Sequence, residues 1–124
     1  MAKVPLISDA EWMVMNVVWR KPGITAAQVV DQLARPFGWS PATIRTMLNR
    51  LVKKGALAFD EQGKRYLYRP AIARDKCVRS ESRSFLARVF GGAVGPMLVH
   101  FVSQAELSPE EIQQLKALLE RKGK

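Results

Sequence analysis

Residues 40–55 read Ser-Pro-Ala-Thr-Ile-Arg-Thr-Met-Leu-Asn-Arg-Leu-Val-Lys-Lys-Gly and carry the start and stop signals of one helix. Ser40 can cap the first backbone amides, and Pro41 at the first helical position loses no hydrogen bond. Gly55 offers the left-handed conformation that ends helices, and Lys53 and Lys54 precede it, where the helix dipole favours cations. The stretch therefore predicts a helix of about four turns.

This predicted helix has two chemically different faces. Its apolar residues recur at three- and four-residue spacing and mark a buried stripe of Ile44, Leu48, Leu51 and Val52. The opposite face carries Thr43, Arg45, Thr46, Asn49, Arg50 and Lys53. A front of Arg, Asn and Thr on an apolar back suits the DNA major groove. A charged face alone is more often an ordinary solvated surface. The sequence on either side of the helix must therefore distinguish a DNA-binding face from a solvated one.

Length and composition limit the possible classes of protein. At 124 residues, the chain has room for one domain, or for one small domain with an oligomerisation segment. No run approaches the roughly 18 apolar residues of a membrane span, and residues 1–6 lack the apolar core of a signal peptide. We therefore expect a cytoplasmic protein. The single cysteine, Cys77, excludes an internal disulfide framework and a zinc site built on several thiolates.

The net charge of +9 is unevenly distributed. Residues 1–83 hold 15 of the 20 Lys and Arg but 7 of the 11 Asp and Glu. Such an excess indicates a polyanionic partner, either nucleic acid or an anionic membrane surface. Because the apolar stripe is needed for a core, nucleic acid is the preferred interpretation.

The elements around residues 40–55 predict a winged helix. Ser8 and Thr25 each begin a capping-box pattern and open helices that precede the recognition helix. The first of these helices ends at Lys21-Pro22-Gly23, and the segment 35–39 breaks the chain after the second. After Gly55, residues 56–59 and 65–69 alternate as strands around a polar turn at residues 60–64. Three helices followed by a hairpin are the order of a winged helix-turn-helix domain.

The remainder of the chain predicts three further helices, at residues 75–90, 93–102 and after Ser108. Their apolar faces can hardly be buried within some 50 residues, so a second copy of the segment is the expected partner. We therefore expect a mainly α protein, with a DNA-binding domain at 1–72 and a helical dimerisation domain at 73–124. Dimerisation also suits DNA binding, because two half-sites about one helical turn apart require two heads.

Three segments resemble the penicillinase-repressor family (BlaI/MecI/CopY). They are residues 7–19, residues 43–55 with the tyrosine-containing hairpin that follows, and residues 85–92, which resemble the family's dimerisation helix. The resemblance covers nearly the whole chain. It implies a dimeric winged-helix repressor of inverted-repeat operators, typically of β-lactamase, penicillin-binding or copper-handling genes. It also implies relief by a signal on the C-terminal domain and a membrane sensor protease as a further partner.

The sequence departs from the family pattern in two features. The copper-responsive branch carries C-terminal cysteines, whereas this chain has none after Cys77, so copper sensing through that motif is not expected. The β-lactam branch is cleaved at an Asn-Phe bond, and the matching bond here is His100-Phe101. Phenylalanine is present and asparagine is not. His100 and Phe101 are nevertheless the candidate cleavage site.

The sequence gives little support for catalysis. We expect that the protein is not an enzyme and that it binds no cofactor or metal ion. His100 is the only histidine and lies in an apolar stretch, where a partly buried imidazole is the plain interpretation and a pH-sensitive interface group the alternative. Cys77 lies near Arg74, Lys76 and Arg79, which favours either a redox-responsive thiolate or simply an inert thiol.

The candidate DNA-binding residues divide by role. Arg45, Thr46 and Asn49 are expected to contact base edges. The expected phosphate contacts are Thr43, Arg50, Lys53 and Lys54 of the helix, with Lys64 and Arg65 of the wing. Two alternatives stay open: a sequence-indifferent architectural DNA-binding protein, and a winged-helix module that binds an acidic protein.

Overall fold

The computed structural model describes residues 4–124, so residues 1–3 of the predicted N-terminal domain lie outside the described part. The chain forms two compact units, Met1–Glu81 and Ser82–Lys124, here called the head and the tail. Helix α4 (Arg74–Phe90) begins in the head and ends in the tail. The predicted domain boundary at residue 72 stays a prediction.

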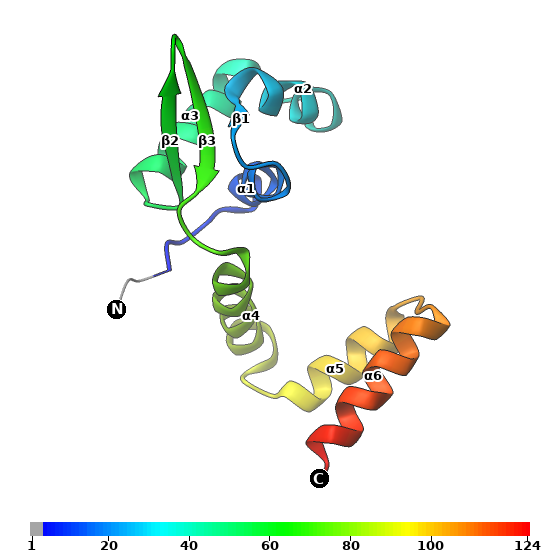
Figure 1. Ribbon diagram of the computed structural model, residues 1–124. Helices are drawn as coiled ribbons and strands as arrows, with labels where there is room; N and C mark the ends of the chain where they lie inside the picture. The colour runs from blue at the N-terminus through cyan, green and yellow to red at the C-terminus, as the bar shows by residue number, and fades with distance from the viewer. Residues whose placement is uncertain (1–3) are drawn as a thin grey trace. The chain divides into compact units, whose positions relative to one another are not determined.

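Three helices form the larger part of the head: α1 (Asp9–Arg20), α2 (Ala26–Phe37) and α3 (Pro41–Lys53) (Figure 1). The capping boxes predicted at Ser8 and Thr25 are confirmed, each with a reciprocal bond to the residue three positions on. Ser40 caps α3 by accepting a hydrogen bond from the Thr43 amide. Gly55 follows the helix with φ +83°, as predicted for its end.

The chain breaks within the predicted segment 35–39, but the first residues of that segment still belong to the helix. Helix α2 continues through Pro36 to Phe37 and stops at Gly38, which has a left-handed conformation with φ +66°. A proline in the last turn removes one backbone hydrogen bond without preventing helical dihedrals. The glycine therefore ends the helix, not the proline.

The wing is a hairpin of β2 (Leu57–Gln62) and β3 (Arg65–Pro70). Gln62 pairs with Arg65, so the expected five-residue turn at 60–64 is wrong and only Gly63 and Lys64 connect the strands. A third strand that the sequence did not predict, β1 (Ile24–Thr25), pairs with β3 and gives the order β1-β3-β2. Two residues are too few to show strand alternation. The arrangement is that of a winged helix, which confirms the predicted fold class.

The head has one apolar core. It is built from α1, α2, α3, the sheet and the first turn of α4, and its fully buried residues include Val14, Met15, Ile24, Ile44, Leu48, Leu51 and Cys77. Trp12 and Trp19 pack half-buried against it with ring centroids 5.6 Å apart. The Trp19 indole Nε1 donates to the Ile72 carbonyl at 3.1 Å. These contacts account for both tryptophans as packing residues.

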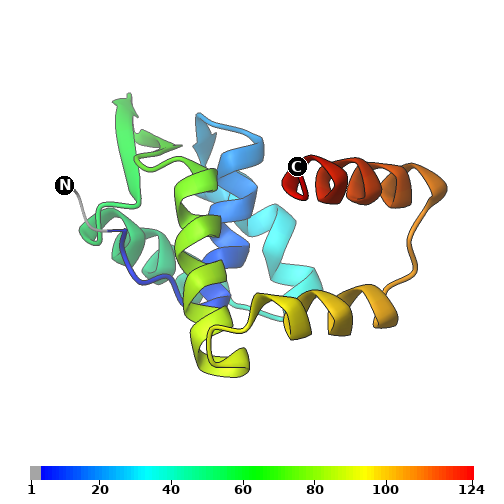
Figure 2. The same cartoon turned by 90° about the horizontal axis from the view of Figure 1, so that it is seen from below.

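The tail consists of the end of α4, followed by α5 (Val94–Gln104) and α6 (Pro109–Lys122), which runs back in the opposite direction (Figure 2). Gly91 and Gly92, with φ +57° and +87°, separate α4 from α5. Ser108 makes the predicted capping box with Glu111. Phe85, Phe90 and Phe101 form an aromatic cluster with centroid separations of 5.8–6.2 Å.

Much of the tail's apolar surface is exposed in the single chain. The exposed side chains are Val89, Val94, Leu98, Val99, Phe101, Val102, Ile112, Leu118 and Leu119. An apolar groove of ≈ 680 Å³ runs between α5 and α6. Within residues 4–124 no single helix is long and apolar enough to cross a membrane; α4 and α5 meet that requirement only as a bent pair.

Candidate nucleic-acid interface

The front of α3 faces solvent along its whole length. Arg45, Thr46 and Asn49 are exposed, whereas Ile44, Leu48 and Leu51 on the opposite side are completely buried. The remaining predicted contacts are also exposed: Thr43, Arg50, Lys53, Lys54, Lys64 and Arg65. The apolar stripe thus fixes the rotation of α3 about its axis and turns its polar residues outward. Their roles toward DNA stay predictions.

Two threonine hydroxyls on α3 make bonds within the helix. The Thr46 hydroxyl donates to the Ala42 carbonyl at 2.9 Å, and the Thr43 hydroxyl lies 2.9 Å from that of Ser40. The bond of Thr46 engages its hydroxyl and leaves its methyl group for apolar contact, the kind of contact that a thymine methyl makes. Thr43 instead forms part of the polar N-terminus of the helix, where an anion is favoured.

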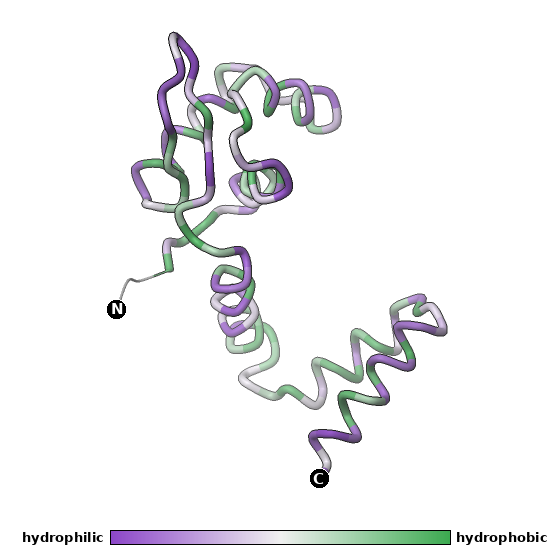
Figure 3. Tube along the Cα trace, viewed as in Figure 1, coloured by the Kyte–Doolittle hydropathy of each residue, from purple (hydrophilic) through white to green (hydrophobic). Residues whose placement is uncertain are grey.

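The wing tip brings further cations beside α3. Figure 3 shows the tip of the hairpin as hydrophilic, and Lys64 and Arg65 lie there. A hollow of ≈ 390 Å³ connects the two elements, lined by Thr25, Ala26, Ala27, Arg45, Lys64, Arg65, Tyr66 and Tyr68. Arg45 of α3 and the two wing cations therefore border one concave surface. The sequence predicted these cations separately but not the surface that joins them.

Aromatic rings cover one side of the wing. Phe59 and Tyr66 stack with centroids 4.2 Å apart, and Tyr68 packs against both at 6.1 and 6.4 Å. Burial raises the pKa of Tyr68, to which Tyr66 adds, and nearby Arg45 opposes the rise. Tyr66 is 44% exposed and borders the hollow. Tyr66 was not among the predicted DNA contacts, although the alternation of residues 65–69 places both tyrosines on the same face of the strand.

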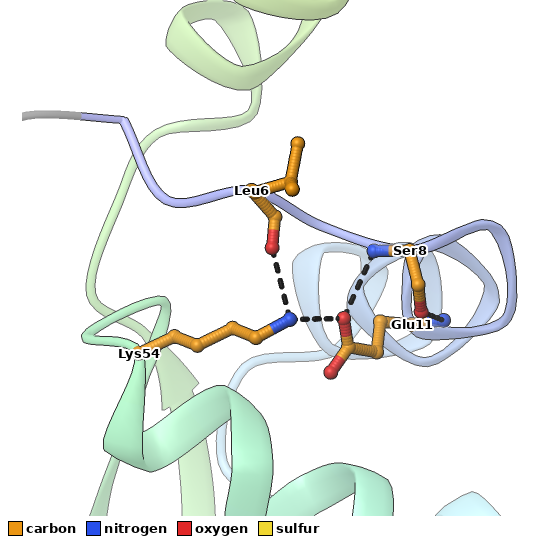
Figure 4. Close-up of polar contacts among 4 residues, drawn as sticks. All are labelled: Leu6, Ser8, Glu11 and Lys54. Atoms are coloured by element: carbon orange, nitrogen blue, oxygen red, sulfur yellow. Dashed lines mark hydrogen bonds and ion pairs between the residues drawn. The ribbon is translucent and has the colours of Figure 1, made fainter.

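Lys54 differs from the other predicted contacts. Its ammonium lies 2.5 Å from the Glu11 carboxylate and donates to the Leu6 carbonyl at 2.9 Å (Figure 4). Glu11 is 2% exposed and was not singled out beyond its capping role. The partner is 43 residues away along the chain, so no local pattern could reveal it.

The remaining candidate residues show no catalytic arrangement. Cys77 is 1% exposed, and burial raises the pKa of its thiol, which favours the inert interpretation. The expected partial burial of His100 is wrong: the imidazole is exposed and packs near the rings of Phe90 and Phe101. Helix α5 has too few neighbours within the chain to cover it. Residues 4–124 hold no group of three or more His, Cys, Asp or Glu that could bind a metal ion.

Comparison with known proteins identifies the family. The sequence profile described as "Penicillinase repressor" matches residues 7–121. The chain is 42% identical over 120 residues to the penicillinase repressor of Bacillus licheniformis, covering 97% of this chain and 94% of the relative. It is 33% identical over 116 residues to the methicillin resistance regulatory protein MecI of Mammaliicoccus sciuri, covering 94% of each.

A solved structure that is similar in fold and sequence supports the same family. The monomeric form of BlaI of Bacillus licheniformis, in complex with the blaP half-operator, has a TM-score of 0.53 and 45% sequence identity. That match covers 60% of this chain and 92% of the other. The Bacillus licheniformis relative is named a repressor, and MecI is named a regulatory protein. This chain therefore belongs to the penicillinase repressor family, as a winged-helix transcriptional repressor and not an enzyme.

Proposed function

We propose that this protein is a cytoplasmic, dimeric repressor that binds an inverted-repeat operator with α3 in the major groove. The observation that carries the proposal is the outward face of Arg45, Thr46 and Asn49 on a helix whose opposite side is buried in the core. The relative BlaI is described in complex with a half-operator, which supports the same use of this head.

The residues of the interface have two different roles, base contact and phosphate contact. Arg45, Thr46 and Asn49 contact base edges and set specificity. The phosphate contacts come from Thr43, Arg50 and Lys53 of the helix with Lys64, Arg65 and, in addition, Tyr66 of the wing. A stacked tyrosine has little rotamer freedom to lose, so its hydroxyl is well placed to donate to a phosphate oxygen.

The tail supplies the dimer contact, and its partner is a second copy of this chain. The groove between α5 and α6 is lined almost entirely by apolar side chains, among them Leu98, Val102, Leu115 and Leu119. Soluble monomers rarely expose so much contiguous apolar surface. One head makes few contacts at physiological salt, so joining two heads raises the affinity through the effective concentration of the second.

The regulated genes encode a β-lactamase, a penicillin-binding protein or a related resistance function, as the names of the relatives suggest. Repression ends when a signal reaches the C-terminal domain, and a membrane sensor protease that cuts the His100-Phe101 bond is the route we favour. The bond lies inside α5, so the cut requires local unwinding. Mass spectrometry of the chain from cells given a β-lactam should show fragments ending at His100; an intact chain in derepressed cells would contradict this route.

Selection of bound sites from genomic DNA tests the function. We expect an inverted repeat whose half-sites lie about one helical turn apart, next to the regulated genes. A labelled duplex with this repeat should bind far more tightly than a scrambled duplex of the same composition. Equal affinity for both duplexes with a steep salt dependence would favour an architectural protein. Failure to retard any duplex at low salt would favour a protein-interaction module.

A further inference from the structure

The ion pair of Glu11 and Lys54 joins three segments of the head. Glu11 Oε1 accepts a hydrogen bond from the Ser8 amide at 2.9 Å and lies 2.5 Å from the Lys54 ammonium (Figure 4). The same ammonium donates to the Leu6 carbonyl at 2.9 Å. Lys54 is the C-cap residue of α3, whereas Ser8 is the N-cap of α1 and Leu6 belongs to the segment before it. We call these contacts the Lys54 clasp.

Burial makes the clasp more than a surface ion pair. The Glu11 side chain is 3% exposed and that of Lys54 is 35% exposed. Desolvation by burial would raise the pKa of Glu11, but the hydrogen bonds from Lys54 and Ser8 outweigh it and hold that pKa below its usual value. A buried carboxylate that lost its cation would be strongly unfavourable, so Lys54 is bound to this position.

We propose that Lys54 is a positioning residue and not a phosphate contact. Its ammonium fixes the C-terminal end of α3 to the start of α1 and thereby sets how Arg45, Thr46 and Asn49 enter the groove. This inference rests on the proposed function. It assigns to Lys54 a different role from that of its neighbour Lys53, which is exposed and for which the described residues offer no ion pair.

The neighbouring lysines make a matched pair of variants. Each of Lys53→Met and Lys54→Met removes one positive charge from adjacent positions at the end of α3. The salt dependence of binding separates their roles. The logarithm of the affinity falls as the logarithm of the salt concentration rises, and each lost phosphate contact reduces the magnitude of this slope by about 1. We expect this decrease for Lys53→Met and an unchanged slope for Lys54→Met.

Glu11→Gln tests the clasp from its other side. Glutamine can keep the capping box with Ser8 but removes the charge that holds Lys54. We expect Glu11→Gln and Lys54→Met each to weaken binding to the specific duplex on the order of tenfold, to weaken scrambled DNA less, and to combine without adding. Affinities are measured by fluorescence anisotropy at a temperature where circular dichroism shows every variant folded.

Each outcome decides the inference. If Lys54→Met reduced the magnitude of the salt slope by about 1, Lys54 would be a phosphate contact and the positioning role would be overturned. So would a lower Tm with an unchanged ratio of specific to scrambled affinity, because that is a structural role alone. If the wild-type protein bound no duplex, the proposed function would fail and this inference with it. Normal wild-type binding with either contrary result would overturn the inference alone.

Discussion

The head and the tail use the same kind of amphipathic helix but bury it differently. In the head, the apolar stripe of α3 is covered by α1, α2 and the sheet, and Ile44, Leu48 and Leu51 are completely buried. In the tail, Leu118 and Leu119 of α6 remain 45% and 59% exposed. An amphipathic pattern shows that a face needs to be covered, but it does not show whether the cover comes from the same chain.

Truncating a core leucine of the head should have the largest effect. We expect Leu51→Ala to lower the free energy of unfolding by about 2–5 kcal/mol, because it leaves a cavity among packed helices. The matched tail variant Leu119→Ala should cost less than about 1 kcal/mol in dilute protein, since its side chain is already largely exposed. Urea denaturation followed by circular dichroism measures both. Equal losses would remove the contrast between the two units.

A charge in the tail groove should break the dimer while leaving the head folded. We expect Leu119→Glu to raise the dimer dissociation constant by about tenfold or more, because a carboxylate would be buried without a partner. Sedimentation velocity over a range of concentrations measures this constant. Gln113→Glu adds the same charge at an exposed position of α6 outside the groove and should change it little. A monomer at every concentration in the wild type would refute the second copy as the partner.

Removing a base contact should weaken specific binding without destabilising the head. We expect Arg45→Ala to cost about 1–3 kcal/mol on the specific duplex and to relax the preference at one position. Lys21→Ala, which removes a positive charge outside the predicted face, is the control. Quantitative mobility-shift titrations on specific and random duplexes measure the effect. Equal weakening on both duplexes would refute a base contact for Arg45.

Lowering the pH should reduce the stability of the folded head slightly, because Glu11 becomes protonated. The folded-state pKa of this carboxyl lies below its ordinary value of 4.5, so its stabilisation is fully present above that value and is lost as the pH falls through the folded pKa. We expect Glu11→Gln to reduce the loss of Tm between about pH 5 and pH 3 by a few degrees. Glu61→Gln, at an exposed position of the wing, should leave the loss unchanged. A profile identical to the wild type in Glu11→Gln would contradict this role.

Local chemistry made most of the elements predictable. Ser8, Thr25, Ser40 and Ser108 each cap the helix that the sequence assigned to them, because a cap involves residues only three positions apart. The outward face of α3 followed from the spacing of Ile44, Leu48 and Leu51 in the same way. The longer wing strands and Pro36 inside α2 were missed, because polar residues and a proline are tolerated at the exposed ends of such elements.

The sequence by itself determined the order of the helices and the wing, the helix caps at Ser8, Thr25, Ser40 and Ser108, and the rotation of the recognition helix. Only the tertiary structure decided that Ile24 pairs with Tyr68, that Cys77 enters the core of the head, and that Lys54 binds Glu11. The first group depends on neighbours within a turn or two of the chain, which periodicity records. The second depends on residues more than 40 positions apart or on neighbours from other elements, and long-range packing leaves no periodic trace in a single sequence.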